Sequence, residues 1–596
     1  KFQGEIQDYM KIAHVPVFIF TRVFIIFPLL SKVLMKEISK LEILSGAAGA
    51  FRPGRLTFIL GPSGAGKTTL LNILARRKRK GVTGFIHGGG RSAVLVAQHA
   101  NLIDSLTADE TLRFAASLKL PRASERQRSF VIQSVSQQLG IFEVLHTRAG
   151  RLSGGERKRL TIACELLTDP AITLLDEPTS GLDSVSSLSL VRALQAVARA
   201  GRTVACVVHQ PSSRLFATAD DVIVLHTGRT LYAGPTAGIP DSLARAGLIC
   251  PQYYNMADYL LEVATGEHIG NLQQLEVEAK EYAQQMKDIA RNELTRTVTP
   301  SQEHDTLLSS NVAVKTGYVA NPWQQLKALL WRGAIGCIRD VHLTQIRVVA
   351  HLLVALMLGA LYHGAGDSAR VASNTGCIFF FLMFLFFSNA MPTIHNFPAE
   401  STVVLQEHLN KWYSIVIYCI TKILVDLPVQ IFCATIFFFP AWYLTSQPME
   451  LQRMVLAWII CLLVTILAQT FGLVIGAACG VKMGLFMIPA ANIPMLVFSE
   501  FFIPYQEMPI YLRPFADISY FRYAFDGLLV AVYGFDRPKL SCKEAYCMFK
   551  SPSYYLDYLG IPQDYVKDIS ILVIWIILLQ ISLLCVLLIK VWRACK

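Results

Sequence analysis

GPSGAGKT at residues 61–68 and LSGGE at residues 152–156 are the stretches that decide the fold. ITLLDE follows at 172–177 and VVHQ at 207–210. The first stretch matches G-x-x-x-x-G-K-[ST], a loop between a strand and a helix whose backbone N–H groups cradle phosphates. One such match occurs by chance in unrelated chains. Four motifs in this order and spacing indicate a phosphate-binding domain of the mixed α/β class.

The loop supplies each group that a nucleotide phosphate needs. Lys67 reaches the β- and γ-phosphates, and the Thr68 hydroxyl is available to Mg²⁺. We predict a strand at 56–60 before the loop and a helix at 69–76 after it, so that the helix dipole adds to the phosphate site. The residues predicted to contact the nucleotide here are Gly61, Pro62, Ser63, Gly64, Ala65, Gly66, Lys67, Thr68 and Thr69.

With LSGGE added, the chain resembles the nucleotide-binding domain of ATP-binding cassette (ABC) transporters, because this string is the signature motif of that family. The resemblance implies ATP and Mg²⁺ as cofactors. It implies that Asp176 holds Mg²⁺ through water, that Glu177 is the general base for the attacking water, and that His209 contacts the γ-phosphate. The resemblance also implies that Gln98 senses the metal and the γ-phosphate. The predicted catalytic set is Lys67, Gln98, Glu177 and His209, and the predicted metal set is Thr68, Gln98 and Asp176.

The same resemblance implies a dimer, because the signature segment caps the ATP that is bound to the other subunit. The residues assigned to that contact are Ser153, Gly154, Gly155, Glu156 and Asp183. All of the motifs are intact. An intact set permits a homodimer, and a heterodimer with a related half-transporter stays open.

Composition favours a membrane protein that carries a soluble ATPase. Of 596 residues, 53% are hydrophobic and only 16% are charged, and the mean hydropathy is +0.42. We interpret the net charge of +12 as Lys and Arg in cytoplasmic loops, not as a nucleic-acid-binding patch. The thirteen Cys are scattered, without the paired spacing of a metal site.

The chain divides into four predicted parts: an amino-terminal segment (1–35), the nucleotide-binding domain (36–268), a polar linker (269–320) and an all-α transmembrane domain (321–596). In the last part we predict six spans, each close to the ~20 residues that cross a bilayer. They are 343–361, 375–394, 416–443, 452–478, 483–503 and 569–592, with an extracellular loop at 504–568. Six spans leave both ends of the domain in the cytoplasm, where the positive-inside rule places Lys590 and Arg593.

An ATPase that precedes one membrane domain resembles the half-transporters of the G subfamily (the White family). Residues 255–259, NMADY, and 407–410, EHLN, look like strings of that subfamily. The second match implies that Glu407 belongs to the coupling contact with the ATPase. The strings at 391–394, 445–448 and 532–537 look most like the branch that exports sterols and lipids.

By similarity to the subfamily, two copies would form an apolar slot for a planar ligand. The residues assigned to this cavity are Phe380, Phe384, Phe387, Asn492, Phe501 and Phe502, with Phe501 and Phe502 as a plug above it. Glu500 departs from the pattern, because a small Gly is common there. Two readings stay open: a functional charge at membrane depth, or a charge that has reached the outer interface.

The function predicted from these features is ATP-driven export of sterols or other lipids by a dimer of half-transporters. The alternatives are a broad xenobiotic or pigment-precursor exporter, and a membrane-anchored regulatory ATPase that transports nothing. The plasma membrane is the favoured location, with endosomes as the alternative. Cys542 and Cys547 could form an extracellular disulfide, and without an N-x-[ST] sequon we expect no N-glycan. Residues 15–35 read either as strand or as an interfacial segment.

Overall fold

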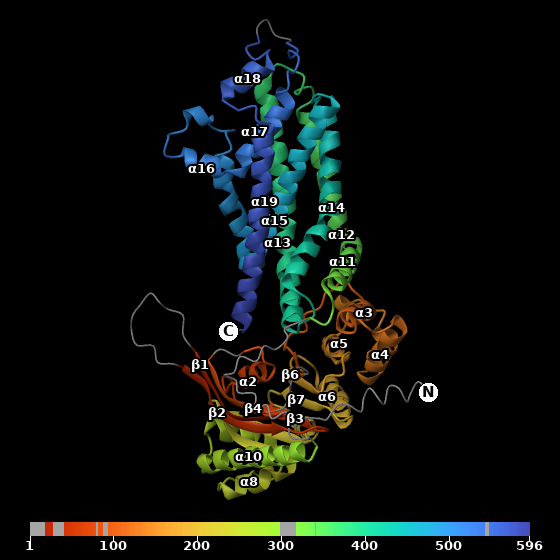
Figure 1. Ribbon diagram of the computed structural model, residues 1–596, viewed down its shortest axis with the longest axis vertical. Coiled ribbons are helices and arrows are strands. Elements are labelled where there is room, and N and C mark those ends of the chain that lie inside the picture. Colours follow the sequence, from red (N-terminus) through yellow and green to blue (C-terminus); the bar gives the residue numbers. More distant parts are fainter. Residues whose placement is uncertain are drawn as a thin grey trace. The chain divides into compact units, whose positions relative to one another are not determined.

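The computed structural model describes residues 18–27, 41–78, 81–87, 93–297, 318–339, 341–542 and 547–595. It forms two compact units, drawn in Figure 1 as a part rich in strands and a part of long helices. The amino-terminal unit contains Lys1–Gln324 together with Gln406–Trp412 and Trp592–Lys596. The helical unit contains Gln325–Leu405 and Tyr413–Val591.

The main sheet of the amino-terminal unit has six strands in the order β5-β6-β7-β3-β8-β9. All neighbours are parallel except β8 and β9. The strands are β3 (Leu56–Leu60), β5 (Ala93–Val96), β6 (Ile172–Asp176), β7 (Thr203–Val207), β8 (Asp221–His226) and β9 (Arg229–Pro235). Every residue of β3, β6 and β7 is buried, as expected of parallel strands that are covered on both faces. The prediction of a strand at 56–60 matches β3.

A second sheet has the order β2-β1-β4 and is antiparallel. It comprises β1 (Phe18–Phe27), β2 (Leu41–Phe51) and β4 (Val82–His87). Strand β1 lies within residues 15–35, which were predicted either as a strand or as an interfacial segment. Residues 1–17 and 28–35 of that segment lie outside the described residues.

The predicted linker is in part a helix of the amino-terminal unit. Helix α10 (Leu272–Thr297) packs against β9, β2 and β1. The compact unit therefore extends beyond the predicted boundary at 268. The Ser/Thr-rich remainder at 298–317 lies outside the described residues.

Three helices of this unit position the candidate site: α2 (Lys67–Leu74), α5 (Gly154–Leu166) and α6 (Ser184–Arg199). Residues 69–76 were predicted to begin the helix that follows the phosphate loop, and most of them lie in α2. The helix begins two residues earlier, after Gly66 in a left-handed conformation, and ends before Arg76, whose φ is 55°. The other α-helices of the described unit are α3 (Ala108–Lys119), α4 (Glu125–Gln138), α7 (Ser213–Phe216), α8 (Ile239–Arg245) and α9 (Met256–Thr265).

The helical unit begins with α11 (Pro322–Arg339), and five of its helices, within the part of the chain that is described, are long and apolar enough to cross a membrane. They are α12 (Val341–Leu361), α13 (Val371–Leu409), α14 (Ile415–Leu444), α15 (Leu451–Val497) and α19 (Tyr565–Cys595). Helix α15 contains the predicted segment 452–478 and residues 483–497 of the next one, and it bends at Gly480, whose φ is 74°. Residues 498–503, predicted as span, lie beyond the end of this helix.

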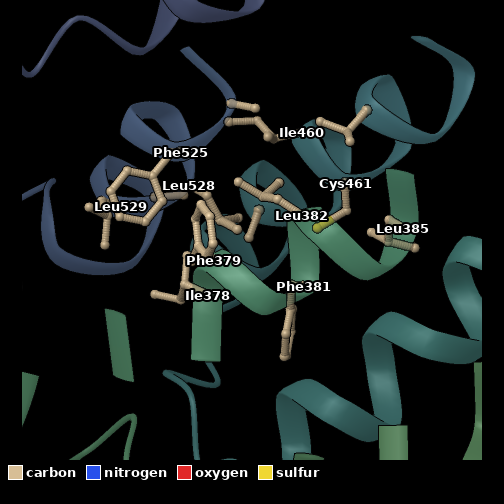
Figure 2. Close-up of a cluster of buried hydrophobic side chains, with 14 of the residues drawn as sticks. Ile378, Phe379, Phe381, Leu382, Leu385, Ile460, Cys461, Phe525, Leu528 and Leu529 are labelled. Carbon is tan, nitrogen blue, oxygen red and sulfur yellow. The ribbon is translucent and has the colours of Figure 1, made fainter. Parts of the chain in front are cut away.

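The predicted extracellular loop is not a simple loop. It contains α16 (Arg513–Ile518), α17 (Tyr520–Tyr533) and α18 (Pro552–Leu559). Helix α17 is buried along its whole length and packs against α15. Figure 2 shows its Phe525, Leu528 and Leu529 in the apolar core with side chains of α13 and α15. Further along, Cys542 and Cys547 are joined by a disulfide.

Candidate functional site

Three adjacent parallel strands bring the predicted ATPase residues to one edge of the main sheet. The phosphate loop follows β3, Asp176 ends β6, and His209 lies two residues after β7. The carboxyl ends of parallel strands are the usual place for a nucleotide site in such folds.

The phosphate loop follows a path that its glycines permit. Gly61 has a φ of 152°, and a Cβ there would lie 2.3 Å from the carbonyl oxygen of Leu225. The Lys67 ammonium donates hydrogen bonds to the carbonyl oxygens of Gly61 (2.7 Å) and Pro62 (2.9 Å), so it lies across the loop. Burial lowers the pKa of Lys67, and the nearby charges of Glu177 and Asp176 oppose that shift. The loop thus has the backbone freedom and the cation that a phosphate requires.

The predicted metal residues Thr68 and Asp176 are in contact. The Thr68 hydroxyl donates a hydrogen bond of 3.3 Å to Asp176 Oδ1. Burial raises the pKa of Asp176, and the hydrogen bond from Thr68 opposes that rise. Within the described residues, no group of three or more His, Cys, Asp or Glu side chains is placed to hold a metal ion. These two oxygens therefore suit Mg²⁺ that arrives with phosphate oxygens as its further ligands.

Glu177, the predicted general base, is fixed by its backbone and by Gln98. Its N–H donates to the carbonyl oxygen of Val207 on β7 (3.1 Å), and its φ is 46°. Its carboxylate Oε2 accepts a hydrogen bond of 2.7 Å from Gln98 Nε2. Glu177 and His209 also line a pocket of about 550 Å³, together with residues 179–182. The structure therefore places Gln98, Glu177 and His209 near one another.

Lys158 is a site residue that the sequence reasoning missed. It lies on α5, and its ammonium donates hydrogen bonds to the backbone carbonyl oxygens of Gln98 and Glu177. Burial lowers the pKa of Lys158, while the charges of Glu177 and Asp176 raise it. The signal in the sequence was a basic residue one turn after the signature glycines. Without a fold, nothing distinguishes it from its basic neighbours at 157 and 159.

The residues assigned to the contact with a second copy lie at the amino-terminal ends of two helices, α5 and α6. Ser153 caps α5 and forms a capping box with Glu156, which satisfies the first N–H groups of the helix. Ser153 and Gly154 are exposed, and Gly155 is buried. Asp183 caps α6 by accepting from the N–H groups of Val185 and Ser186, and hydrogen bonds to Ser186 hold the pKa of Asp183 below its usual range. The exposed end of α5 is therefore available to a second copy.

The opposite end of α5 contacts the segment that connects two membrane helices. Glu165, one residue before that end, accepts hydrogen bonds from Lys119 Nζ (2.5 Å), Trp412 Nε1 (3.2 Å) and the Asn410 amide. Lys119 also lies 4.6 Å from the centroid of the Trp412 ring. The predicted coupling residue Glu407 lies in the same segment, Gln406–Trp412, which belongs to the amino-terminal unit. The contacts of this segment to Glu165 come from Asn410, the last residue of the EHLN string, and from Trp412.

Three of the predicted cavity residues lie on one face of α13. Phe380, Phe384 and Phe387 are spaced i, i+4, i+7, which places them on one stripe of a helix. They are half-buried, whereas Phe381 and Phe386 between them are fully buried. Phe384 packs against Phe437 of α14, with ring centroids 4.8 Å apart.

The predicted plug residues contact α13, and Asn492 does not join them. Phe501 stacks on Phe379 with centroids 4.0 Å apart and planes at 7°. Phe502 makes an edge contact with Phe379 and is 55% exposed. Asn492 is fully buried and accepts a hydrogen bond from the Tyr520 hydroxyl, so its amide lies in the interior of the unit. Figure 2 shows Phe379 turned toward Phe525 of α17.

Comparisons with known proteins agree with this arrangement. A family model described as ABC transporter matches residues 44–180, and one described as ABC-2 type transporter matches residues 324–533. The chain is 33% identical to Protein white of Drosophila melanogaster over 84% of this chain and 76% of that protein. It is 31% identical to Protein white of Ceratitis capitata, with 84% and 77% covered.

A plant relative extends the similarity. ABC transporter G family member 26 of Arabidopsis thaliana is 28% identical, with 83% of this chain and 76% of that protein covered. The phosphate loop, the Thr68–Asp176 contact and the Gln98–Glu177 contact all lie within the residues that the ABC transporter model matches, and the ABC-2 type match follows them. The chain belongs to the White (G) family of ABC transporters and couples ATP hydrolysis to transport across a membrane.

Proposed function

We propose that this protein exports sterols or other planar lipids and that it works as a dimer. The observation that carries the proposal is the stripe of Phe380, Phe384 and Phe387 on α13, which is apolar, half-buried and free of charge. A flat apolar surface with few polar groups suits a rigid hydrophobic ligand. Two copies that face each other would present this stripe twice, and the ligand would enter between them.

The ATPase residues have distinct roles in the proposal. The backbone N–H groups of the phosphate loop and Lys67 would hold the β- and γ-phosphates, and Thr68 and Asp176 would hold Mg²⁺. Mg²⁺ bound there would supply positive charge that neutralises the phosphates. Gln98 and Lys158 hold Glu177 in place, and Glu177 takes the proton of the attacking water. His209 orients the γ-phosphate from the other side of the same pocket.

The dimer is supported by the exposed end of the signature helix. Ser153 and Gly154, at the start of α5, are exposed, and the positive end of a helix dipole attracts phosphate. In the proposal this end completes the ATP site of the second copy. Movement of α5 on ATP binding then reaches the membrane helices through Glu165, Asn410 and Trp412.

The proposal is tested by ATP hydrolysis of the purified chain in lipid nanodiscs, with and without cholesterol, beside Glu177→Gln. We expect activity that rises with sterol and is absent from the variant. Activity that ignores sterol but rises with drug-like or pigment-precursor ligands would instead support the broad-exporter alternative. Hydrolysis with no movement of any ligand in sealed vesicles would support a regulatory ATPase.

Location and partner are parts of the same proposal. We place the protein in the plasma membrane, with endosomes as the alternative, and imaging of the tagged full chain distinguishes the two. A lack of activity in the chain alone, restored by co-expression with a related half-transporter, would replace the homodimer with a heterodimer.

A further inference from the structure

The segment between α15 and η4 (Tyr505–Glu507) carries a buried charge directly beside the aromatic plug. Its sequence is FSEFFIP at 498–504. Glu500 has a φ of 64°, a left-handed conformation that an L-residue other than Gly, Asn or Asp rarely adopts. Such a conformation persists only where the surroundings fix it.

Two neighbouring residues of this segment are fixed by the same helix. Glu500 Oε1 lies 2.5 Å from Arg522 Nε of α17. Phe501 meets Phe525 of α17 edge-on, with centroids 5.9 Å apart, in addition to its stack on Phe379. Arg522 and Phe525 are spaced i, i+3 and share one face of α17. Glu500 and Phe501 are therefore both held by α17. Movement of this segment away from α17 would break both contacts.

The ion pair is buried but poorly satisfied. The Glu500 side chain is 2% exposed, yet among the described residues neither of its oxygens has an aligned hydrogen-bond donor. Arg522 is shared with Asp517 (2.6 Å) and with Asp526 (3.7 Å), and it lies 4.1 Å from the centroid of the Tyr505 ring. Arg522 therefore keeps other partners when Glu500 leaves. A buried pair of this kind adds little to stability, and its best attested use is in registry or switching.

We propose that the Glu500–Arg522 ion pair is a latch that holds the plug closed. This inference rests on the proposed function, because it takes the passage beside Phe501 and Phe502 as the exit of the ligand. When the pair separates, Phe501 leaves its stack on Phe379 and the segment turns outward. Glu500 is thus a positioning residue for the gate and does not contact the ligand.

Ser499 offers a probe for gate opening that needs neither substrate nor ATP. It is fully buried, and its Oγ has no hydrogen-bond partner among the described residues, so Ser499→Cys changes little. The full chain carrying Ser499→Cys is placed in vesicles without nucleotide. A membrane-impermeant thiol reagent is added on the side opposite the ATP site, and the labelling rate is corrected for the chain with Ser499 intact.

The latch predicts that Glu500→Gln raises the labelling rate of Cys at position 499 at least tenfold. The matched control is Asp517→Asn, which removes another partner of Arg522 whose side chain is 51% exposed, and it should leave the rate within twofold. Equal rates for Glu500→Gln and its parent would overturn the latch. An equal rise with Asp517→Asn would also overturn it, because the effect would then belong to Arg522 in general.

A second variant tests the pair from the other side, and the melting temperature of every variant shows whether it has folded. Glu500→Gln combined with Arg522→Gln removes both charges of this ion pair, although Asp517 and Asp526 then also lose their contact with Arg522. We expect it to label as fast as Glu500→Gln alone, and a rate equal to that of the parent would contradict the latch. The labelling assay involves no transport. Loss of sterol export with normal latch behaviour would therefore reject the proposed function and leave the latch standing.

Discussion

Glu177 is held from three sides, by the N–H bond to Val207, by Gln98 and by Lys158. This restraint matters for a general base, because proton transfer depends on hydrogen-bond reach. Variants of Glu177 and Lys158 separate the effect of the base itself from the effect of the residue that positions it.

Replacement of the base should abolish turnover and preserve nucleotide binding. For Glu177→Gln we expect kcat to fall by about 10²- to 10⁴-fold, the usual contribution of a positioned acid or base. Phosphate release measures the rate, and binding of a fluorescent ATP analogue measures retention of the site. Glu143→Gln, an exposed residue of the same unit, is the control. Full turnover in Glu177→Gln would show that another group is the base.

Removal of the Lys158 ammonium should misplace the base. Lys158→Met deletes two hydrogen bonds to backbone carbonyl oxygens, and hydrogen bonds to a charged group are worth about 1.5–3 kcal/mol each. We expect kcat to fall at least tenfold and KM for ATP to change less than threefold. Arg126→Gln on the exposed face of α4 is the control. A change in KM alone would assign Lys158 to ATP binding. A change in thermal stability alone would assign it to folding.

At the scale of elements, α5 joins the two functions of the molecule. Its first residues would meet ATP on a second copy, and Glu165 near its last residue contacts the segment between α13 and α14. A helix is stiff along its axis, so displacement at one end appears at the other. Coupling therefore depends on the contacts of Glu165.

Glu165→Gln should uncouple the ATPase from its ligand. Glu165 and Lys119 are 5% and 9% exposed, and a buried ion pair that loses one charge costs about 3 kcal/mol. We expect the melting temperature to fall and sterol stimulation of ATP hydrolysis to disappear, with basal hydrolysis retained. Glu278→Gln breaks a more exposed pair, with Arg245, and should do neither. Intact stimulation in Glu165→Gln would rule out this route.

The bend in α15 should depend on the conformation of Gly480. Its φ of 74° and ψ of 179° lie in a region open essentially to Gly alone, so Gly480→Ala should cost about 1–3 kcal/mol. A Cβ at Gly480 would meet no atom within 4 Å, so the cost is conformational. Gly476→Ala, in the same helix, would make only ordinary contacts of 3.6–3.7 Å. Equal melting temperatures for the two variants would contradict this explanation.

Sequence patterns predicted a helix or strand best where local hydropathy alone determined its bounds. Strand β3 is a short, mostly apolar run (LTFIL) between Arg55 and the first glycine of the phosphate loop, and its predicted bounds agree with the structure. Helix α17 was missed as an element because Arg522 and Asp526 interrupt its apolar sequence. Both are buried: they pair with each other across one helical turn, and Arg522 also pairs with Glu500, which precedes the helix. A hydropathy pattern contains no information on such pairs.

In the candidate site, too, some residues could be placed from the sequence and others could not. The phosphate-loop residues could be placed from one motif, because the motif itself fixes the backbone. Asn492 and Phe379 could not be placed, because the rotation of a membrane helix about its axis follows from its neighbours and not from its own residues. Lys158 was hidden among three adjacent basic residues, of which only the fold selects one.

At the scale of the whole molecule, an ATPase unit of the ABC type is joined in one chain to a unit of long apolar helices. The intact motifs indicate the site of ATP hydrolysis. Membership of the White family indicates that this hydrolysis is coupled to transport. In the proposed function, the Phe stripe of α13, the plug at Phe501 and the charge at Glu500 would line a path for an apolar ligand. ATP hydrolysis at Glu177 would move a sterol along this path.

The most direct test is the movement of labelled sterol in sealed proteoliposomes that contain the full chain, with ATP supplied on the side of the ATPase. The account predicts ATP-dependent sterol movement that is lost in Glu177→Gln and reduced in Phe387→Ala, with basal ATP hydrolysis retained in the latter. Equal sterol movement by the intact chain and by Glu177→Gln would contradict it.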